Sequence, residues 1–365
     1  AIAGDPQRNI DFYVNVLGQR LVKKTVNFDD PFTYHLYYGD EVGSPGTIMT
    51  FFPWAHARRG RPGNGQVIAS AYNIDSRSVD YWQQRLAEFD THAVTRGERF
   101  GAPVIGFDDP DGMRLELIAH EGLPAPAPWT DGPVPAEHML RAFHGVTIGV
   151  ADQRATAALL TDQMGYRFIE QEGMRYRFQG ASADHGQYVD LLVRPDQGYG
   201  QMGGGTVHHV AFRVPDDDAE LAYQAALHRA GHGVTEVKDR QYFHSIYFRE
   251  PSGTLFEIAT DQPGFATDES VAELGHNLQL PSWLEARRAV IAETREMEGL
   301  TLGNWQVIEA AGPALRLEVQ VQAAQDFSRQ QGLALQDRLS EHLQHPVELT
   351  LLVVPMSRLE LAEEP

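Results

Sequence analysis

The fold is decided by two short apolar stretches, Val207-His208-His209-Val210-Ala211-Phe212-Arg213-Val214 and Gly253-Thr254-Leu255-Phe256-Glu257-Ile258-Ala259-Thr260-Asp261. Both are predicted to be β-strands of one small unit. Because alternate side chains of a strand face opposite sides, Val210 and Phe212 line one face and His209 lies on the other. The same alternation puts Phe256 on a core face and Glu257 opposite it. A histidine and a carboxylate therefore face away from the apolar core.

Two interpretations of this pair stay open. An ionised carboxylate in such a strand is costly unless a cation or hydrogen-bond donors meet it. A metal ion held by His209 and Glu257 would meet that need. A hydrogen-bonded histidine of the sheet and an ion-paired glutamate would meet it equally well.

The composition is that of a soluble globular protein. With 365 residues, the chain is long enough for two ordinary domains and a small third one. Its hydrophobic fraction is 42% and its charged fraction is 22%, whereas a disordered chain would be less apolar. A formal net charge of −20 disfavours binding to nucleic acid or to an anionic membrane surface. No apolar run approaches the roughly 18 residues of a membrane span.

The chain contains no cysteine. This excludes disulfide bonds, thiolate metal sites and a cysteine nucleophile, so histidine and carboxylate are the expected ligands of any metal. The first residues show no charged segment followed by an apolar one, as a secretory signal would, and a cytoplasmic location is predicted.

Four weak repeats organise the sequence, with a period of about 55 to 70 residues. Each repeat has a first strand, a helix, and then strands that end in an apolar segment. The predicted helices run from Asp5 to Leu21, Ser76 to Phe89, Asp152 to Met164 and Asp216 to Arg229. Each helix begins on Ser or Asp, whose side chains cap the free N–H groups of a first turn.

The closing strands of the repeats carry a polar residue near the middle. In the repeat alignment, residues 46–53, 112–120, 187–195 and 253–261 place Thr50, Glu116, Asp190 and Glu257 at one position. Glu116 is interpreted either as an ion-paired relic of the repeat or as a metal ligand.

The first strands place His209 opposite residues that cannot bind a metal, Gly145 and Ala69. His144 aligns with His208 on the other face and is interpreted as structural. In the first repeat, the counterpart of His209 would fall a few residues before Ala1.

A segment rich in Pro and Gly, residues 122–139, is a plausible linker between two pairs of repeats. We therefore predict a first domain at 1–121, whose first strand is truncated, and a second at 140–265, which carries the candidate metal-ligand strands. A helical extension at 266–300 and a small α/β tail at 301–365 follow. The tail shows a strand–helix–strand pattern and no residues that point to chemistry.

The repeats resemble the vicinal oxygen chelate superfamily, which includes glyoxalases, extradiol dioxygenases and bleomycin-resistance proteins. Four blocks resemble the members that cleave hydroquinone rings: Asp5-Pro6-Gln7-Arg8-Asn9, residues 21–30 (LVKKTVNFDD), residues 34–40 (YHLYYGD) and residues 245–251 (SIYFREP). The resemblance covers about residues 1 to 298. It implies an α+β fold of four βαβββ modules, paired into two domains with curved mixed sheets.

The resemblance also implies a mononuclear iron(II) site of two histidines and one glutamate, with positions left open for substrate and dioxygen. His209 and Glu257 match two of these ligands. The third normally lies in a His-His-Ile-Thr-like segment just upstream of the equivalent of Ala1, so we expect impaired iron binding and activity in the sequence as given. Tyr247, Arg240 and His208 match pocket residues and are the catalytic candidates.

The expected activity is cleavage of a hydroquinone-type ring by dioxygen. A glyoxalase-like metal-dependent isomerase or lyase is the second hypothesis, and it would need a further ligand such as Glu116. A non-catalytic binder of flat aromatic ligands is the third. The expected partners are a small aromatic substrate and dioxygen, without nucleic acid or membrane, and self-association into a homo-oligomer is left open.

Overall fold

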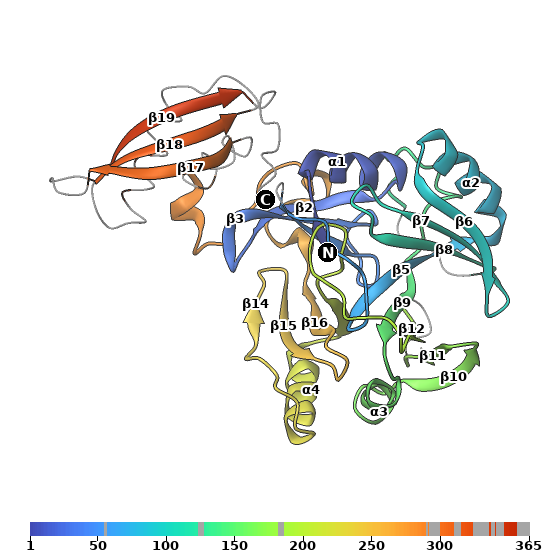
Figure 1. Ribbon diagram of the computed structural model, residues 1–365. Helices are drawn as coiled ribbons and strands as arrows, with labels where there is room; N and C mark the ends of the chain where they lie inside the picture. The colour runs from blue at the N-terminus through green and yellow to red at the C-terminus, as the bar shows by residue number, and fades with distance from the viewer. Residues whose placement is uncertain are drawn as a thin grey trace. The chain divides into compact units, whose positions relative to one another are not determined.

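A computed structural model of the chain describes residues 1–54, 57–122, 128–181, 186–289, 291, 300–309, 315–323, 336, 340 and 347–355 (Figure 1). The chain divides into two compact units, Ala1–Pro281 and Ser282–Pro365. No helix within the described residues is long and apolar enough to cross a membrane.

The first unit contains four modules of the predicted βαβββ type. The first consists of β1 (Ile2–Ala3), α1 (Pro6–Ile10) with the π-helical segment η1 (Asp11–Val16), β2 (Arg20–Asn27), β3 (Asp30–Gly39) and β4 (Met49–Pro53). The second consists of β5 (Gln66–Asp75), the 3-10 turn η2 (Ser76–Ser78), α2 (Val79–Glu88), β6 (His92–Arg99), β7 (Ala102–Asp108) and β8 (Arg114–His120).

The third and fourth modules repeat this order. The third contains β9 (Phe143–Val150), α3 (Arg154–Asp162), β10 (Arg167–Glu172), β11 (Arg175–Gln179) and β12 (Tyr188–Val193). The fourth contains β13 (Val210–Val214), α4 (Asp217–Arg229), β14 (Lys238–Asp239), β15 (Phe243–Arg249) and β16 (Leu255–Pro263). The predicted α+β class with four modules is confirmed.

Three of the four predicted helices begin at an aspartate cap close to the predicted start, whereas α3 follows Gln153, whose side chain makes no capping bond. The first helical segment ends at Val16 and not at the predicted Leu21, because β2 begins at Arg20.

Asp5 accepts a hydrogen bond from the backbone N–H of Arg8, and Asp216 accepts one from that of Ala219. In the second module the capping side chain is Asp75, one residue before the predicted start. These bonds satisfy N–H groups that have no partner within the helix.

In each module the first strand pairs with the last in parallel. The register sets Ala71 opposite Glu116, Thr147 opposite Asp190 and Ala211 opposite Glu257. The predicted alignment of the three carboxylates is therefore confirmed. Each of them lies at the same height on the inner strand of its own module.

The strands of the four modules form three sheets. The first module forms the sheet β1-β4-β3-β2, and the fourth forms β13-β16-β15-β14. The second and third modules share an eight-stranded sheet in the order β10-β11-β12-β9-β5-β8-β7-β6, because β5 and β9 pair antiparallel (Figure 1). This sheet contains strands from both of the predicted domains, whose boundaries stay a prediction.

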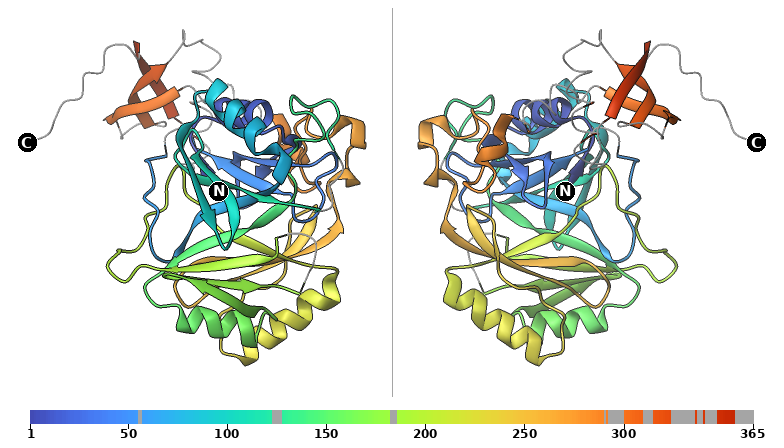
Figure 2. Two further views of the ribbon diagram at one scale, coloured as in Figure 1. Left: turned by 90° about the vertical axis from the view of Figure 1, so that its right-hand side faces the viewer. Right: turned by 90° about the vertical axis from the view of Figure 1, so that its left-hand side faces the viewer.

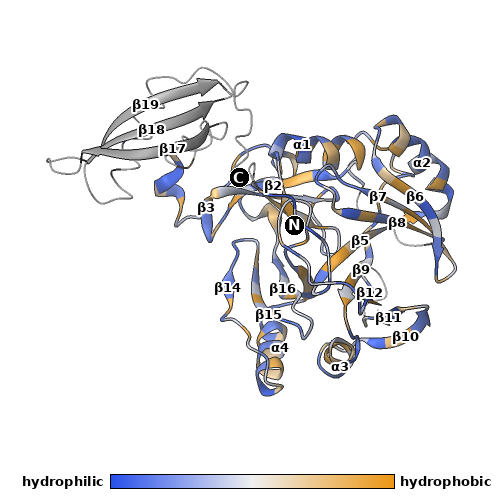
Figure 3. Ribbon diagram, viewed as in Figure 1, coloured by the Kyte–Doolittle hydropathy of each residue, from blue (hydrophilic) through white to orange (hydrophobic). Residues whose placement is uncertain are grey.

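The hydrophobic cores follow the order of the chain instead. One core joins the first two modules and includes Tyr13, Phe51, Trp82 and Leu115. The other is built mainly from the last two modules, with Leu160, Leu191 and Phe256 among its buried residues. Accordingly, α1 and α2 lie together at one end of the unit and α3 and α4 together at the other (Figure 2). The helices carry both polar and apolar residues, as helices that cover a sheet on one side do (Figure 3).

The helical extension predicted after β16 lies partly outside the described residues. Three 3-10 helices, η3 (Phe265–Thr267), η4 (Val271–Glu273) and η5 (Glu285–Arg287), lie in the described part of the predicted helical extension. The second unit contains β17 (Leu300–Glu309), β18 (Leu315–Ala323) and β19 (Val347–Pro355). Here β18 pairs antiparallel with β17 and parallel with β19, while most of the expected tail helix lies outside the described residues.

Lys23 ties the segment after β16 to the first module. Its side chain is fully buried, and its Nζ lies 2.6 Å from a carboxylate oxygen of both Asp268 and Glu269. The ammonium group also lies 4.8 Å from the centre of the Tyr242 ring. A buried ion pair is costly to break on one side only, because the remaining charges lose their partner.

We predict that Lys23→Met lowers the free energy of unfolding by about 3 kcal/mol, because Asp268 and Glu269 then lack a cation. Denaturant titration with circular dichroism measures the loss. Lys24→Met is the matched control, since Lys24 is more exposed and its Nζ bonds only a backbone oxygen. Equal losses in both variants would contradict a special role for Lys23.

Candidate active site

A cavity of about 680 Å³ is lined mainly by residues of the first, third and fourth modules. Its volume lies in the range of small-molecule sites, which are typically largely apolar with a few polar groups. Aromatic rings supply much of the wall, including those of Phe28, Tyr37, Phe52, Trp54, Phe143, Tyr166, Tyr188, Phe212, Tyr242, Phe243 and Phe265. The wall therefore suits a flat aromatic ligand.

His209 and Glu257 meet at this cavity. His209 directly precedes β13, and Glu257 lies in β16, the strand that pairs with β13, opposite Ala211. The Nε2 atom of His209 lies 3.0 Å from Oε2 of Glu257, and their side chains are 15% and 3% exposed. Both residues line the cavity. The two side chains thus converge on one face, as the strand alternation predicts.

Tyr247 completes the surroundings of the carboxylate. It lies in β15 directly opposite Glu257, and its hydroxyl donates to Oε1 of that residue at 2.6 Å. The phenol oxygen in turn accepts hydrogen bonds from Oγ of Ser245 at 2.9 Å and from Nε of Arg240 at 3.2 Å. A chain of hydrogen bonds therefore runs from Arg240 through Tyr247 to Glu257.

The charge states follow from these contacts. Burial raises the pKa of the Glu257 carboxyl, but the adjacent His209 and the hydrogen bond from Tyr247 outweigh burial and leave the pKa below its ordinary value. Burial also raises the pKa of the Tyr247 phenol well above its ordinary value, and the charge of Glu257 adds to the effect. At neutral pH, Glu257 is therefore ionised and Tyr247 keeps its proton.

His208 lies beside His209, with 2.9 Å between their Nδ1 atoms. Burial lowers the pKa of His208 to about 3, so its imidazole is neutral at neutral pH. If a metal took the place of the hydrogen on Nε2, Nδ1–H of His209 could donate to His208 and the lone pair of Nε2 would face the metal. That is the tautomer in which a histidine binds a metal.

Two further residues of the site, His35 and Tyr37, were not predicted. Tyr37 in β3 lies opposite Thr50, which is the relation that Tyr247 has to Glu257. Nδ1 of His35 lies 2.8 Å from the Tyr37 hydroxyl, and its ring packs between Tyr37 and Phe52. Aligning the third strands of the modules, as well as the first and last, would have found them.

His35 contributes a neutral imidazole to the cavity wall. Burial lowers its pKa well below the ordinary value, and positive groups nearby act in the same direction. Its Nε2 atom is buried and has no hydrogen-bond partner in the described part of the chain. His35 thus places a nitrogen atom that can still form a hydrogen bond beside the candidate metal ligands.

The geometry of His209 and Glu257 fits a metal ion. Two adjacent ligands at about 2.1 Å from a metal and at right angles are about 3 Å apart, which matches the separation of Nε2 and Oε2. The other polar atom of each side chain, Nδ1 of His209 and Oε1 of Glu257, is hydrogen-bonded to a neighbouring residue. Metal ligands in proteins are commonly held by such hydrogen bonds. Within the described residues, no group of three or more His, Asp or Glu side chains could hold a metal.

The strand register locates the counterpart of His209 in the first module. Ile2 pairs with Phe52, so Thr50 lies opposite the residue before Ala1. His209 lies two residues before the partner of Glu257. The equivalent position in the register is therefore the third residue before Ala1.

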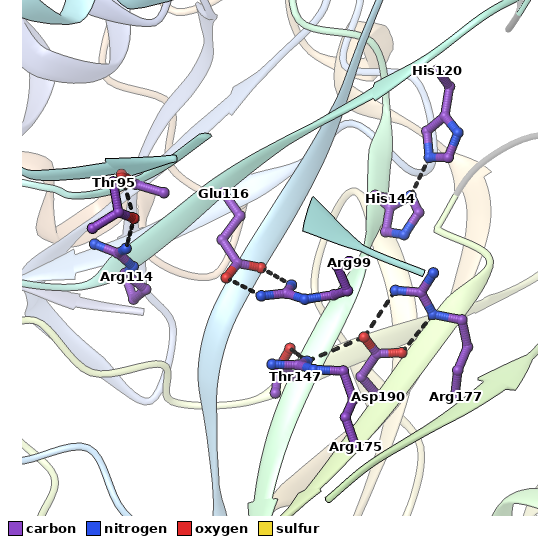
Figure 4. Close-up of polar contacts among 11 residues, drawn as sticks. Thr95, Arg99, Arg114, Glu116, His120, His144, Thr147, Arg175, Arg177 and Asp190 are labelled. Atoms are coloured by element: carbon purple, nitrogen blue, oxygen red, sulfur yellow. Dashed lines mark hydrogen bonds and ion pairs between the residues drawn. The ribbon is translucent and has the colours of Figure 1, made fainter. Parts of the chain in front are cut away.

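The corresponding positions of the eight-stranded sheet hold ion pairs (Figure 4). Glu116 pairs with the guanidinium of Arg99, whose Nη2 lies 2.7 Å from Oε1. Asp190 accepts hydrogen bonds from Arg177 at 2.8 and 2.9 Å and from Arg175 at 3.1 Å. Glu116 is therefore engaged in an ion pair of its own sheet and is not a spare ligand.

The positions equivalent to His209 in this sheet carry no ligand. They are Ala69 and Gly145, and a Cβ atom on Gly145 would lie 2.0 Å from the backbone oxygen of Tyr188. His144 is buried, bonds Oδ1 of Asn73 at 2.9 Å and stacks on His120 at 5.0 Å between ring centres. These contacts agree with its structural interpretation.

A family model described as the Glyoxalase/Bleomycin resistance protein/Dioxygenase superfamily matches residues 1–117 and again residues 142–258. The chain belongs to this superfamily. It is 47% identical over 293 residues to the protein named "Putative ring-cleaving dioxygenase MhqO" of Bacillus subtilis, which covers 80% of this chain and 93% of that protein. It is also 34% identical to "Chlorohydroquinone/hydroquinone 1,2-dioxygenase" of Sphingobium indicum, over 80% of this chain and 92% of that one.

A solved structure is similar over the same region. The crystal structure titled as a putative dioxygenase from Bacillus subtilis shares 47% identity with this chain and superposes with a TM-score of 0.78. It covers 80% of this chain and 94% of its own. The resemblance to the vicinal oxygen chelate superfamily is confirmed.

We predict that Glu116→Gln lowers the free energy of unfolding by about 3 kcal/mol, because it leaves the partly buried guanidinium of Arg99 without this carboxylate. Iron content should stay unchanged, since Glu116 lies outside the candidate site. Thermal unfolding and metal analysis of one preparation measure both. Glu98→Gln, an exposed position of β6, is the control. A loss of iron without a loss of stability would indicate instead that Glu116 is a metal ligand.

Proposed function

We propose that the chain is an iron(II)-dependent ring-cleaving dioxygenase of hydroquinone-type aromatic compounds. The observation that carries the proposal is the convergence of His209, Glu257 and Tyr247 on one aromatic-lined cavity. The names of the relatives point to the same reaction. The atoms of this reaction balance, because both atoms of dioxygen enter the product while the ring C–C bond beside a hydroxylated carbon breaks.

His209 and Glu257 are the proposed iron ligands in this chain. When bound, iron(II) supplies the redox chemistry that joins an aromatic diol to dioxygen, which a redox-inert metal cannot do. The ionised Glu257 contributes negative charge, and His209 a neutral nitrogen. A third histidine is proposed at the position that precedes Ala1 by three residues.

Tyr247, Arg240 and His208 are the proposed substrate-binding and proton-transfer groups. The Tyr247 hydroxyl can return a proton to an oxygen of the substrate, since Arg240 and Ser245 hold its orientation. The guanidinium of Arg240 always donates hydrogen bonds, whereas a neutral imidazole such as that of His208 can donate or accept. The aromatic wall orients the ring and excludes water.

Oxygen uptake tests the proposal directly. The chain is loaded with iron(II) under anaerobic conditions, and hydroquinone and dioxygen are then added. We expect uptake that His209→Ala and Glu257→Ala abolish. A parallel chain that begins with His-His-Ile-Thr before Ala1 should bind more iron and consume oxygen faster.

The outcomes separate the alternative functions. Isomerase or lyase activity with a redox-inert metal, in the absence of oxygen uptake, would favour the glyoxalase-like hypothesis. Tight binding of hydroquinone without uptake in either chain would favour a non-catalytic binder. Full iron content and undiminished turnover without the added segment would show that the third ligand has been misplaced.

We predict that Tyr247→Phe lowers the turnover number by at least about tenfold, because the proton donor is lost. The free energy of unfolding should fall by no more than about 1.5 kcal/mol, since the ring packing stays and one hydrogen bond is lost. Oxygen-electrode kinetics and denaturant titration measure the two effects. Tyr223→Phe is the control, because Tyr223 also lines the cavity. A loss of several kcal/mol, as in a core truncation, would make Tyr247 structural.

A further inference from the structure

The charged side chains of the cavity are paired with one another. Among the described residues that line it, the charged ones are Asp29, Arg213, Arg240, Glu257 and Asp261. Arg213 forms a two-point ion pair with Asp261, with Nε 2.9 Å from Oδ1. Arg240 forms an ion pair with Asp29, with 2.9 Å between Nη1 and Oδ2. Both guanidinium groups are thus matched by a carboxylate.

The guanidinium of Arg240 is held on two sides. Its Nε donates to the hydroxyl of Tyr247 at 3.2 Å, and its Nη1 donates to Asp29. Its central carbon lies 5.3 Å from the centre of the Tyr247 ring. A guanidinium with a free edge is a good receptor for a carboxylate, because it offers parallel N–H groups. In this cavity one of those groups is already occupied.

Asp29 comes from the opposite side of the cavity. It lies in the turn between β2 and β3 of the first module, whereas Arg240 lies between β14 and β15 of the fourth. The backbone N–H of Asp29 donates to Oδ1 of Asn27 at 3.0 Å, which fixes the turn. The side chain of Asp29 is 70% exposed and that of Arg240 is 18% exposed. The pair therefore lies where the cavity meets solvent.

We propose that Asp29 is a specificity-determining residue, which occupies Arg240 and thereby excludes aromatic substrates that carry a ring carboxylate. The substrate class that remains is the uncharged para-diphenols. This inference rests on the proposed function, because it concerns the ligands of the same cavity.

The physical basis is the charge of the wall. A carboxylate that enters the cavity loses its hydration and needs a cation or donors in return. Among the described residues of the wall, each guanidinium is paired with a carboxylate, and the carboxylates of Asp29, Glu257 and Asp261 outnumber the two arginines. An uncharged diphenol loses far less hydration and needs only single hydrogen bonds. The cavity consequently discriminates by charge.

The position of Arg240 makes the discrimination selective for substituents near the reacting carbon. Tyr247 is hydrogen-bonded to both Glu257 and Arg240, so only the Tyr247 side chain separates the guanidinium from the proposed metal ligand Glu257. A carboxylate beside the ring oxygen that faces Glu257 falls within reach of Arg240. Once Asp29 is neutralised, the free edge of Arg240 can bind that carboxylate.

The test compares the binding of hydroquinone and 2,5-dihydroxybenzoate, which differ by one ring carboxylate. Both are titrated anaerobically into the iron-loaded protein by calorimetry, so that no turnover occurs. We expect the wild type to prefer hydroquinone. In Asp29→Asn, the ratio of the two affinities should shift toward the carboxylate by about tenfold, the size of one charge-assisted hydrogen bond.

Two controls isolate the ion pair. Asp30→Asn removes the same charge from the neighbouring residue, which bonds Thr33 instead, and should leave the ratio unchanged. Asp29→Asn combined with Arg240→Gln should cancel the shift, because the receptor itself is gone. A wild type that binds both ligands equally, or a ratio that Asp29→Asn does not move, would overturn the inference.

The proposed function and this inference can fail separately. If hydroquinone causes oxygen uptake but Asp29→Asn does not change the ratio of the two affinities, the proposed dioxygenase function stands. The proposed role of Asp29 would then be wrong. A shifted ratio without uptake of oxygen in any form of the chain would remove the dioxygenase and keep the charge selectivity. Failure of the wild type to bind either ligand would overturn both.

Discussion

The buried carboxylate of Glu257 is the constraint on which the site depends. A charged group that is 3% exposed needs partners of its own. The neighbouring strand supplies His209 on one side, and β15 supplies Tyr247 on the other. Arg240 and Ser245 then satisfy the phenol, and Asp29 satisfies Arg240. These polar groups thus form one chain of hydrogen bonds and ion pairs that begins at the Glu257 carboxylate and ends at Asp29.

The repeated modules meet the same constraint in different ways. Where the fourth module sets a histidine against its carboxylate, the second sets Arg99 against Glu116 and the third sets Arg177 against Asp190. An arginine beside a buried carboxylate gives a closed ion pair, which leaves no lone pair for a metal. A neutral histidine leaves one. The partner of the carboxylate, and not the carboxylate, therefore separates the candidate active site from its structural copies.

Strand periodicity explains what the sequence could predict. Alternation placed His209 and Glu257 on one face, and the repeat fixed their register, since both depend on local geometry. The third strands of the modules, once aligned, indicate Tyr37 and His35, but the role of Asp29 was missed because it depends on how the first module faces the fourth. No local pattern records that. The pairing of β5 with β9, which joins strands across the predicted linker, was also not predicted, because it too is a long-range contact without a local pattern.

That pairing explains why the cavity forms where it does. The second and third modules are joined through β5 and β9, and each shares a core with its sequence neighbour. The first and fourth modules are thereby brought face to face, although Asp29 and Arg240 are 211 residues apart in sequence. Groups from both ends of the four-module unit therefore line one cavity. The two middle modules, whose carboxylates are closed in ion pairs, carry the strand pairing that brings the two halves of the candidate site together.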